Sequence, residues 1–418
     1  MYEPFGYLEE LLALRMSVMG RDPTTVPESV ILHAELASAS LSHLLPDISK
    51  DQHPQLLREI YFHQSWATLD ERHFDPADPV FGFLLESTDL ADPESVLARA
   101  ASGEPFVFCT FHFGSYRLLN ALLAQHGVRF DLVVDRASLR RQGDKWMRIL
   151  HAIHTGRGDE GVPQTLLDAE DPRVGLQAIR RVKRGGSLVL YIDGNTGTGG
   201  VRRRDEKLIE IEFLGQGLFA RQGVAFLSHV TGAHLVPVVC KRTGWLRRTM
   251  QFYPAIDPTG TEREVFCRET TQELYALLAD HLRTAPEQWE GWLYVHKYLN
   301  TERLRARYPA PARREEVPLS EEDVLVLNRD RYVPLYVHGH PVLMDRATYD
   351  AEQVSRELSD VLNAFGEPAR LADVARRLGA DVVSRTVVQD LLRRSVLVHA
   401  AAASATEAAE NGEGFAHG

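Results

Sequence analysis

The chain has 418 residues, 44% of them hydrophobic, which is enough for two or three globular domains with sizeable cores. Its formal net charge of -11 disfavours nucleic acid as a partner, and its three widely spaced cysteines disfavour a disulfide framework or a cysteine-rich zinc site. The N-terminus has no signal-peptide pattern, and no apolar stretch approaches the ~18–20 residues that span a bilayer, so we expect a cytoplasmic protein with no transmembrane segment.

Residues 1–100 predict an N-terminal helical layer. The runs 7–19 and 30–45 repeat apolar residues at helical spacing, and prolines such as Pro27 and Pro46 interrupt the pattern. Several helices are therefore expected before the first strand of the core.

Residues 101–310 predict an α/β core in which helices flank a mixed sheet. Short apolar runs alternate here with stretches long enough for helices, which is typical of a layered sheet. The predicted strands lie at 105–111, 130–134, 187–192, 235–239 and 250–252. The run 263–283 predicts an amphipathic helix, and the aromatic-rich run 286–300 predicts a helix that closes the sheet's edge or face.

After a charged, proline-containing stretch at 308–318, residues 319–399 predict a small C-terminal domain. Three short strands are predicted, at 324–327, 332–337 and 341–344. Three helices are predicted to follow, at 351–365, 371–378 and 383–394. Their order resembles a winged-helix layout, and the alternative is a small helical docking or dimerisation domain. Residues 400–418, rich in Ala, Glu and Gly, predict a disordered tail.

His112 is the strongest candidate for a catalytic residue. It follows the predicted strand 105–111, and the Gly-Ser pair after it predicts the turn that ends the strand. Sheets of this class bind their ligands outside the carboxyl ends of the strands, often beside helix N-termini. An imidazole in that place is suited to act as a general base.

Four segments of the core carry a resemblance to a known family. They are 112–117 (HFGSYR), 188–194 (LVLYIDG), 211–216 (IEFLGQ) followed by 232–238 (GAHLVPV), and 286–297 (PEQWEGWLYVHK). In this order they resemble the lipid A biosynthesis (lauroyl/myristoyl) acyltransferases and the related phosphatidylinositol mannoside acyltransferases, over about residues 100–300. The resemblance implies a glycerolipid-acyltransferase-like fold and transfer of an acyl group from an acyl carrier protein or acyl-CoA thioester to a hydroxyl.

The family pattern places an Asp or Glu five residues after its catalytic His, and this chain departs from that pattern. Carried over, the base is His112, but Arg117 stands where the carboxylate is expected. The carboxylate would hold the imidazole in one tautomer and offset its charge after proton abstraction. A guanidinium would instead lower the pKa of the imidazole.

Three explanations of this departure stay open. Another carboxylate takes over, with Asp193 as the first candidate and Glu210 and Glu212 behind it. Alternatively the acceptor is an amine, which when neutral depends less on a strong base, or the transferase chemistry is lost. Arg117 itself either binds a phosphate or carboxylate of donor or acceptor, or pairs with a surface acid.

Further candidates are predicted to bind substrate. They are Gly114, Ser115, Asn195, Phe213 and Gly215. Backbone N–H groups of the first two could stabilise the oxyanion of a tetrahedral intermediate. The glycine-rich loop 193–200 predicts a tight turn at the pocket, and the Arg run 202–204 could attract an acidic carrier protein or be merely solvated.

Some conspicuous side chains are given structural roles. Trp289, Trp292 and Tyr294 are expected to pack rather than to stack on a ligand. The neighbouring histidines at 151 and 154, and at 338 and 340, lack a third ligand at metal spacing, so no metal site is predicted.

Together these observations predict a soluble acyltransferase that uses an acyl-CoA or phosphopantetheine-bound thioester as substrate and needs no other cofactor. Its acceptor would be a hydroxyl or amine on a small molecule or on a carrier-tethered intermediate. The C-terminal domain is expected to dock a carrier protein, a partner enzyme or a second copy of the chain. The rival hypothesis is a non-catalytic binding or scaffold protein that acts through this domain.

Overall fold

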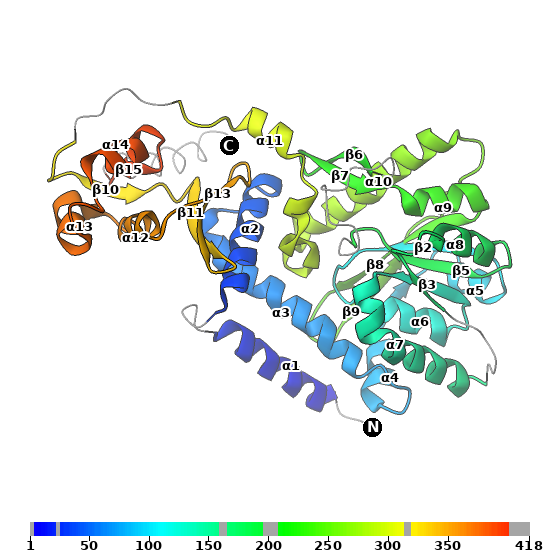
Figure 1. Ribbon diagram of the computed structural model, residues 1–418. Helices are drawn as coiled ribbons and strands as arrows, with labels where there is room; N and C mark the ends of the chain where they lie inside the picture. The colour runs from blue at the N-terminus through cyan, green and yellow to red at the C-terminus, as the bar shows by residue number, and fades with distance from the viewer. Residues whose placement is uncertain (1–3, 22–25, 159–164, 195–207, 313–318, 401–418) are drawn as a thin grey trace, which may run out of the picture. The chain divides into compact units, whose positions relative to one another are not determined.

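The computed structural model describes residues 4–21, 26–158, 165–194, 208–312 and 319–400. The chain forms two compact units, one made of residues 1–23 and 40–299 and the other of residues 24–39 and 300–418. The first contains the sheet-based core (Figure 1), and the second contains the elements of the predicted C-terminal domain. Residues 24–39, expected in the N-terminal layer, group with the second unit, in which Glu35 pairs with Arg346.

A seven-stranded sheet organises the first unit, in the order β1-β9-β8-β2-β5-β3-β4. The strands are β1 (Thr88–Ala91), β2 (Phe106–Thr110), β3 (Phe130–Val134), β4 (Leu166–Asp168), β5 (Ser187–Tyr191), β8 (His234–Arg242) and β9 (Arg248–Phe252). Neighbours are parallel except for the antiparallel pair β8 and β9. The prediction of an α/β fold with a mixed sheet is confirmed.

The central strand β2 shows most clearly why the predicted strands form, because its residues are buried on both faces of the sheet. All five residues of β2 are buried, as helices cover a mainly parallel sheet on both sides. β1 and β4, which were not predicted, have only 4 and 3 residues and lie at the two edges. Short edge strands carry too few apolar residues to give a sequence pattern.

Helices cover both faces of the sheet (Figure 1). The largest hydrophobic cluster joins side chains such as Phe106 and Phe108 of β2 to the helices of one face. Those helices are α1 (Pro4–Met19), α3 (His53–Arg72), α4 (Pro79–Glu86), α5 (Val96–Ala101), α6 (Leu118–Gln125) and α7 (Arg136–Gly156). The other face carries α8 (Val174–Val182), α9 (Gly223–Thr231) and α10 (Arg263–Thr284). The helix predicted at 263–283 is confirmed as α10.

A hairpin of β6 (Leu208–Phe213) and β7 (Gln216–Arg221) stands apart from the main sheet. Its two-residue turn has Leu214 at φ 50° and Gly215 at φ 76°. Positive φ at both central positions matches the twist of a tight hairpin, and glycine adopts it without strain.

The single helix predicted at 286–300 is wrong. The segment instead forms three short 3-10 helices, η5 (Pro286–Gln288), η6 (Glu290–Leu293) and η7 (Val295–Lys297). Trp289 between the first two is extended and makes a β-bridge to Phe113. A side chain on Gly291 would collide with the Trp289 ring. Long-range contacts therefore override the aromatic helical pattern here.

The second unit contains two small antiparallel sheets, β14-β10-β15 and β11-β12-β13. Its strands are β10 (Val324–Leu327), β11 (Tyr332–Val337), β12 (His340–Asp345), β13 (Ala351–Gln353), β14 (Ala369–Arg370) and β15 (Leu397–His399). Its helices are α11 (Thr301–Arg307), α12 (Arg356–Ala364), α13 (Leu371–Leu378), α14 (Arg385–Arg393) and the first part of α2 (Glu28–Leu44). Its later elements follow in the order α12, β14, α13, α14 and β15, and the winged-helix-like assignment stays a prediction.

One predicted element of this unit needs correction. The helix expected at 351–365 begins only at Arg356, because Ser355 accepts a hydrogen bond from Leu358 N–H as its N-cap. The preceding residues pair with β12 as a strand. The predicted tail at 400–418 lies, apart from Ala400, outside the described residues. In the part of the chain that is described, no helix combines the length and the apolar character needed to cross a bilayer.

Candidate active site

Two neighbouring strands bring the candidate residues together. β2 and β5 are parallel, with Thr110 paired to Tyr191 at their carboxyl ends. His112 follows β2 and Asp193 follows β5, so both side chains lie at the same edge of the sheet. This is the edge at which sheets of this class bind ligands.

The carboxylate of Asp193 binds the imidazole of His112. Nδ1 of His112 lies 2.8 Å from Oδ1 of Asp193. The other oxygen, Oδ2, accepts hydrogen bonds from the backbone N–H of His112 at 2.9 Å and from Nε1 of Trp289 at 2.7 Å. The side chain of Asp193 is only 3% exposed, whereas that of His112 is 22% exposed. The carboxylate is thus fixed in the protein interior, and the imidazole lies between it and solvent.

The surroundings of His112 favour its charged form. Burial lowers the pKa of the imidazole, but Asp193, and more weakly Glu290, outweigh this effect, so the pKa lies above its usual value despite the opposing charge of Arg117. The rings of Tyr116 and Tyr191 each lie 4.9 Å from the imidazole, centroid to centroid, and limit its rotation. The site can therefore stabilise an imidazolium, which a base becomes when it takes a proton.

His112 lies on the wall of a cavity of about 1460 Å³. With Asp193 accepting from Nδ1, the proton sits on Nδ1 and Nε2 carries the lone pair. Nε2 makes no hydrogen bond to any described residue. The imidazole is consequently placed to accept a proton from a molecule in the cavity.

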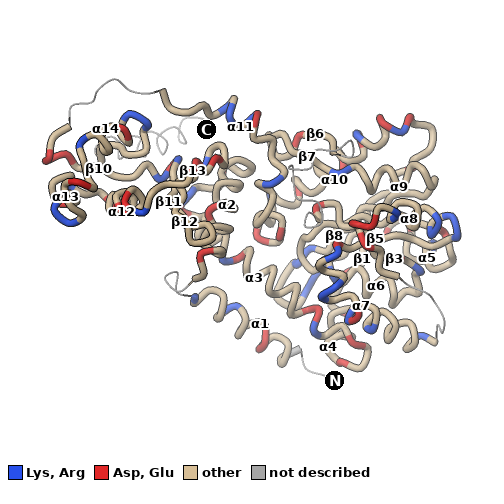
Figure 2. Tube along the Cα trace, viewed as in Figure 1, with Lys and Arg blue, Asp and Glu red and all other residues tan. Residues whose placement is uncertain are grey.

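The cavity combines apolar and charged walls. Its apolar lining residues include Leu132, Val134, Ile149, Leu190, Val224 and Leu227. Its charged lining is mixed, since Arg117, Arg136 and Arg141 occur together with acids such as Glu71 and Glu170. Two of these arginines, Arg136 and Arg141, belong to α7, along which basic residues lie (Figure 2). The cavity thus offers an apolar surface and, at several positions, arginines that an anionic group could contact.

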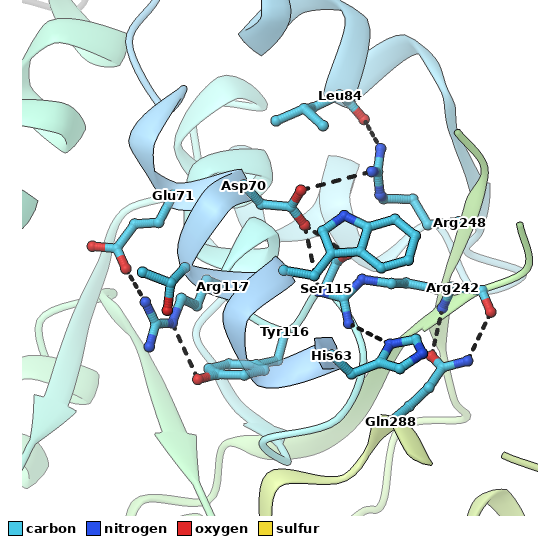
Figure 3. A network of polar contacts seen from close by, with 12 residues as sticks. His63, Asp70, Glu71, Leu84, Ser115, Tyr116, Arg117, Arg242, Arg248 and Gln288 are labelled. Carbon is cyan, nitrogen blue, oxygen red and sulfur yellow. Dashed lines mark hydrogen bonds and ion pairs between the residues drawn. The ribbon is translucent and has the colours of Figure 1, made fainter. Parts of the chain in front are cut away.

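Arg117 also lies on the cavity wall, and its charge is balanced by a buried acid. Its Nη1 donates to Glu71 and its Nε donates to the hydroxyl of Tyr116 at 3.1 Å (Figure 3). Glu71 is 4% exposed and also accepts from Trp146 Nε1 at 2.8 Å and pairs with Lys145 Nζ at 3.2 Å. Arg117 therefore pairs with a buried acid rather than with a surface one.

Comparison with known proteins identifies the family. The sequence profile of the bacterial lipid A biosynthesis acyltransferases matches residues 83–300, just over half of the chain. The chain belongs to this family. The resemblance predicted from the four segments is confirmed, and the protein is an acyltransferase.

A structural comparison matches the acyltransferase with the 1-acyl-sn-glycerophosphate (LPA) acyltransferase PlsC from Thermotoga maritima. The two sequences are 12% identical, the match covers 61% of this chain and 97% of that chain, and the TM-score is 0.30. No curated protein sequence matches the acyltransferase.

The geometry bears directly on the missing family carboxylate. Of the three carboxylates considered as replacements, Asp193 contacts His112, whereas Glu210 and Glu212 are exposed on β6. A relocated carboxylate is therefore the explanation that the geometry of the acyltransferase supports best.

The predicted oxyanion donors are already engaged. The backbone N–H of Gly114 donates to the carbonyl of Gln288 at 2.9 Å, and that of Ser115 donates to the carbonyl of Cys240 at 3.0 Å. Neither amide is available to a substrate oxygen, so this prediction is wrong. The turn packs closely between η5 and β8, and its two amides satisfy one backbone carbonyl of each.

The remaining predicted substrate-binding residues are placed differently. Phe213 is buried against the rings of Tyr275 and Trp289, and Gly215 forms the hairpin turn. Neither lines the cavity of the described residues, so packing and turn geometry account for both without a substrate. Asn195, most of the loop 193–200 and the Arg run 202–204 lie outside the described residues.

The sequence analysis missed one side chain of the site, Glu290, and gave another, Trp289, a packing role only. Glu290 lines the cavity, donates its backbone N–H to the carbonyl of His112 at 2.9 Å, and accepts from Tyr116 Oη at 3.0 Å. Trp289 does pack, as expected, but it also binds Asp193. Their place in the most specific of the four segments was the only available signal. Among the described residues, no cluster of three or more His, Cys, Asp or Glu side chains could hold a metal ion.

Proposed function

We propose that this acyltransferase moves an acyl group from a thioester of an acyl carrier protein or CoA to a hydroxyl or amine. The acceptor is a small molecule or a carrier-tethered intermediate. His112 acts as general base, and Asp193 fixes its tautomer and offsets its charge. The 2.8 Å contact between Nδ1 of His112 and Oδ1 of Asp193 carries the proposal.

The reaction follows from the placement of the imidazole. Nε2 takes the proton of the acceptor's O–H or N–H while the acceptor oxygen or nitrogen attacks the thioester carbonyl carbon. Asp193 stabilises the imidazolium that forms. When the tetrahedral intermediate collapses, the C–S bond breaks and the imidazolium returns its proton to the sulfur. The products are an ester or amide and a free thiol.

The cavity suits both parts of such a donor. Its apolar walls would enclose the acyl chain, whose burial from water is favourable by about 0.8 kcal/mol per CH₂ group. Arg136 and Arg141 of α7, which line the cavity, would attract the phosphates of CoA or phosphopantetheine. The apolar walls and these basic residues suit an acyl-CoA and an acyl-carrier-protein thioester equally.

Arg117 is proposed to bind an anionic group of the donor or acceptor. Its Nε and Nη1 are occupied by Tyr116 and Glu71, whereas its Nη2 makes no hydrogen bond to a described residue. A guanidinium fixed at two nitrogens keeps its third in a defined direction, which suits recognition of a phosphate or carboxylate oxygen.

The direct test is release of free thiol from acyl-CoA and acyl-carrier-protein thioesters, supplied with hydroxyl and amine acceptors. We expect His112→Ala to lower the rate with the best pair by about 10³-fold, since general base catalysis contributes on that order. His126→Ala, which changes an exposed histidine at the end of α6, is the matched control. Wild-type turnover by the His112 variant would eliminate the proposed mechanism.

The second compact unit is proposed to dock a carrier protein, a partner enzyme or a second copy of the chain. Light scattering of the full chain, alone and mixed with acyl carrier protein, tests the first and third of these. A mass equal to one chain in both samples would leave only the partner enzyme.

A further inference from the structure

Two consecutive acidic residues at the end of α3 contact the turn that follows His112. Asp70 Oδ2 accepts a hydrogen bond from Ser115 Oγ at 3.0 Å, and Glu71 accepts one from Arg117 (Figure 3). Both acidic side chains are almost wholly buried, at 3% and 4% exposed. An N-terminal helix therefore binds the turn at two positions, three and five residues beyond His112.

Asp70 is itself fixed by a dense set of donors. Tyr7 Oη of α1 donates to Oδ1, and the guanidinium groups of Arg242 and Arg248 lie 3.5 and 3.9 Å from its two oxygens. Those arginine side chains are 2% and 1% exposed. Removing one member of such a buried group leaves uncompensated charge, so the cluster holds Asp70 in one position.

Neutral partners complete the surroundings of Arg242. The guanidinium lies over the ring of Trp66, 4.6 Å from its centroid. Burial, with Arg242 and Arg15 nearby, lowers the pKa of His63 to about 2. The neutral ring of His63 accepts from Arg242 Nη1 through Nδ1 at 3.2 Å. Arg242 thus cannot move toward solvent without losing these contacts.

The opposite side of the turn is fixed by β8 and η5. Gln288 binds both backbone groups of Arg242 through its side-chain amide, at 2.9 Å each, and accepts from Gly114 N–H through its carbonyl. Gly114 has φ 62°, and a Cβ there would lie 2.0 Å from the carbonyl oxygen of Cys240. The turn is therefore held between this surface and α3.

We propose that Asp70 and Glu71 are positioning residues for acyl transfer, acting through Ser115 and Arg117 on the turn that carries His112. The inference rests on the proposed function of His112. It makes the N-terminal helices α1 and α3 part of the catalytic apparatus rather than a cover for the sheet. Asp70 sets the position of the imidazole relative to the cavity, and Glu71 sets the direction of the Arg117 guanidinium.

Ser115→Ala is the cleanest variant, because it removes the bond to Asp70 without leaving a buried charge unpaired. We expect kcat for thiol release to fall by about 10 to 100-fold, because a catalytic group misplaced by up to about one ångström loses that much rate. KM for the thioester should stay within about twofold of the wild-type value. Glu71→Gln, which keeps the shape but not the charge, should mainly raise KM by about tenfold.

Ser187→Ala is the matched control. The hydroxyl of Ser187 is also buried and accepts a hydrogen bond from Phe106 N–H at 3.1 Å. Ser187, however, is the first residue of β5 and lies at the end of the strand away from His112. The melting temperature of Ser187→Ala should fall at least as far as that of Ser115→Ala, while the kcat of Ser187→Ala stays unchanged. A merely structural role for Ser115 predicts that the two variants behave alike.

Measuring His112→Ala in the same assay separates the two proposals. Loss of turnover in that variant, together with wild-type kcat and KM in the Ser115 and Glu71 variants, overturns the positioning role alone. Wild-type turnover in the His112 variant overturns the proposed function. If Ser115→Ala does not fold, Ser115→Cys, which fills a similar volume but is a weaker donor to Asp70, is assayed for kcat against KM in its place, and an unchanged kcat there contradicts the proposal.

Discussion

Two ion pairs lie at the two ends of the segment 112–117, and they differ in whether their charge can change. At one end, His112 pairs with Asp193 from the neighbouring strand; at the other, Arg117 pairs with Glu71 from α3. The charge of the first pair can change, because an imidazole gains and loses a proton near neutral pH. The charge of the second is permanent, because a guanidinium does not deprotonate in proteins.

This difference explains how the chain departs from its family's pattern. The family places both the His and its carboxylate within one segment, and here the carboxylate comes from the end of β5 instead. Arg117 does not contact the imidazole's carboxylate; it pairs with Glu71 on the cavity wall. In the proposed function, His112 at one end of the segment moves protons and Arg117 at the other end binds an anion.

Removing the charge of Asp193 should have the largest effect on turnover. We expect Asp193→Asn to lower kcat by about 10³-fold, because the imidazole loses its tautomer control and its counter-charge. His112 must be neutral to act as a base, so kcat/KM rises with pH through its pKa. Asp193 raises that pKa, so the rise should move to lower pH in the variant. A pH profile of thiol release measures both; an unshifted profile would contradict the pairing.

Restoring the family pattern at position 117 should fail. Arg117→Asp would put a second carboxylate beside buried Glu71, and like charges in the interior are strongly unfavourable. We expect kcat/KM to fall by about 10²-fold, because the variant loses the guanidinium and also adds a charge that repels Glu71. Improved acylation of a hydroxyl acceptor by this variant would mean that Asp193 does not replace the family carboxylate.

Neutralising the same position should affect binding more than chemistry. Arg117→Met should raise KM for the thioester or for the acceptor by about tenfold, as expected for one charge-assisted hydrogen bond, and change kcat little. Steady-state kinetics with each substrate varied in turn shows which of them carries the anion. A drop in kcat alone would argue that Arg117 acts on the base.

Of the two ion pairs, the sequence predicted that of His112 with Asp193 and missed that of Arg117 with Glu71. Asp193 could be nominated because parallel neighbouring strands end at the same edge, which depends only on strand order. Glu71 could not, because a buried acid in an amphipathic helix has no local signature and its partner is 46 residues away. The same applies to Asp70, whose four charged or hydroxyl partners come from distant elements.

The fold shows a similar limit. Central strands such as β2 and β5 were predicted because burial on both faces leaves a continuous apolar run. The segment 286–300 was misassigned because its aromatic spacing is helical, while its backbone is set by contacts with the turn at Phe113 and with β7. Residues that bind the site from another element are thus the ones that local patterns describe least well.

Glu290 should have the smallest effect of the residues around the base. It raises the pKa of His112 less than Asp193 does, so Glu290→Gln should move the rise of kcat/KM slightly to lower pH and change kcat only a few-fold. Gln keeps an oxygen that can accept from Tyr116. A shift to higher pH would show that another group dominates the titration.

The central claim is that His112 and Asp193 work as one unit, and a double-mutant cycle tests it most directly. Turnover of the best thioester and acceptor pair is measured for His112→Ala, Asp193→Asn and the double variant. Residues that act together lose no more in combination than the more damaging change loses alone. The account predicts that Asp193→Asn has no further effect once His112 is absent. An equal fold-loss from Asp193→Asn in both backgrounds would contradict it.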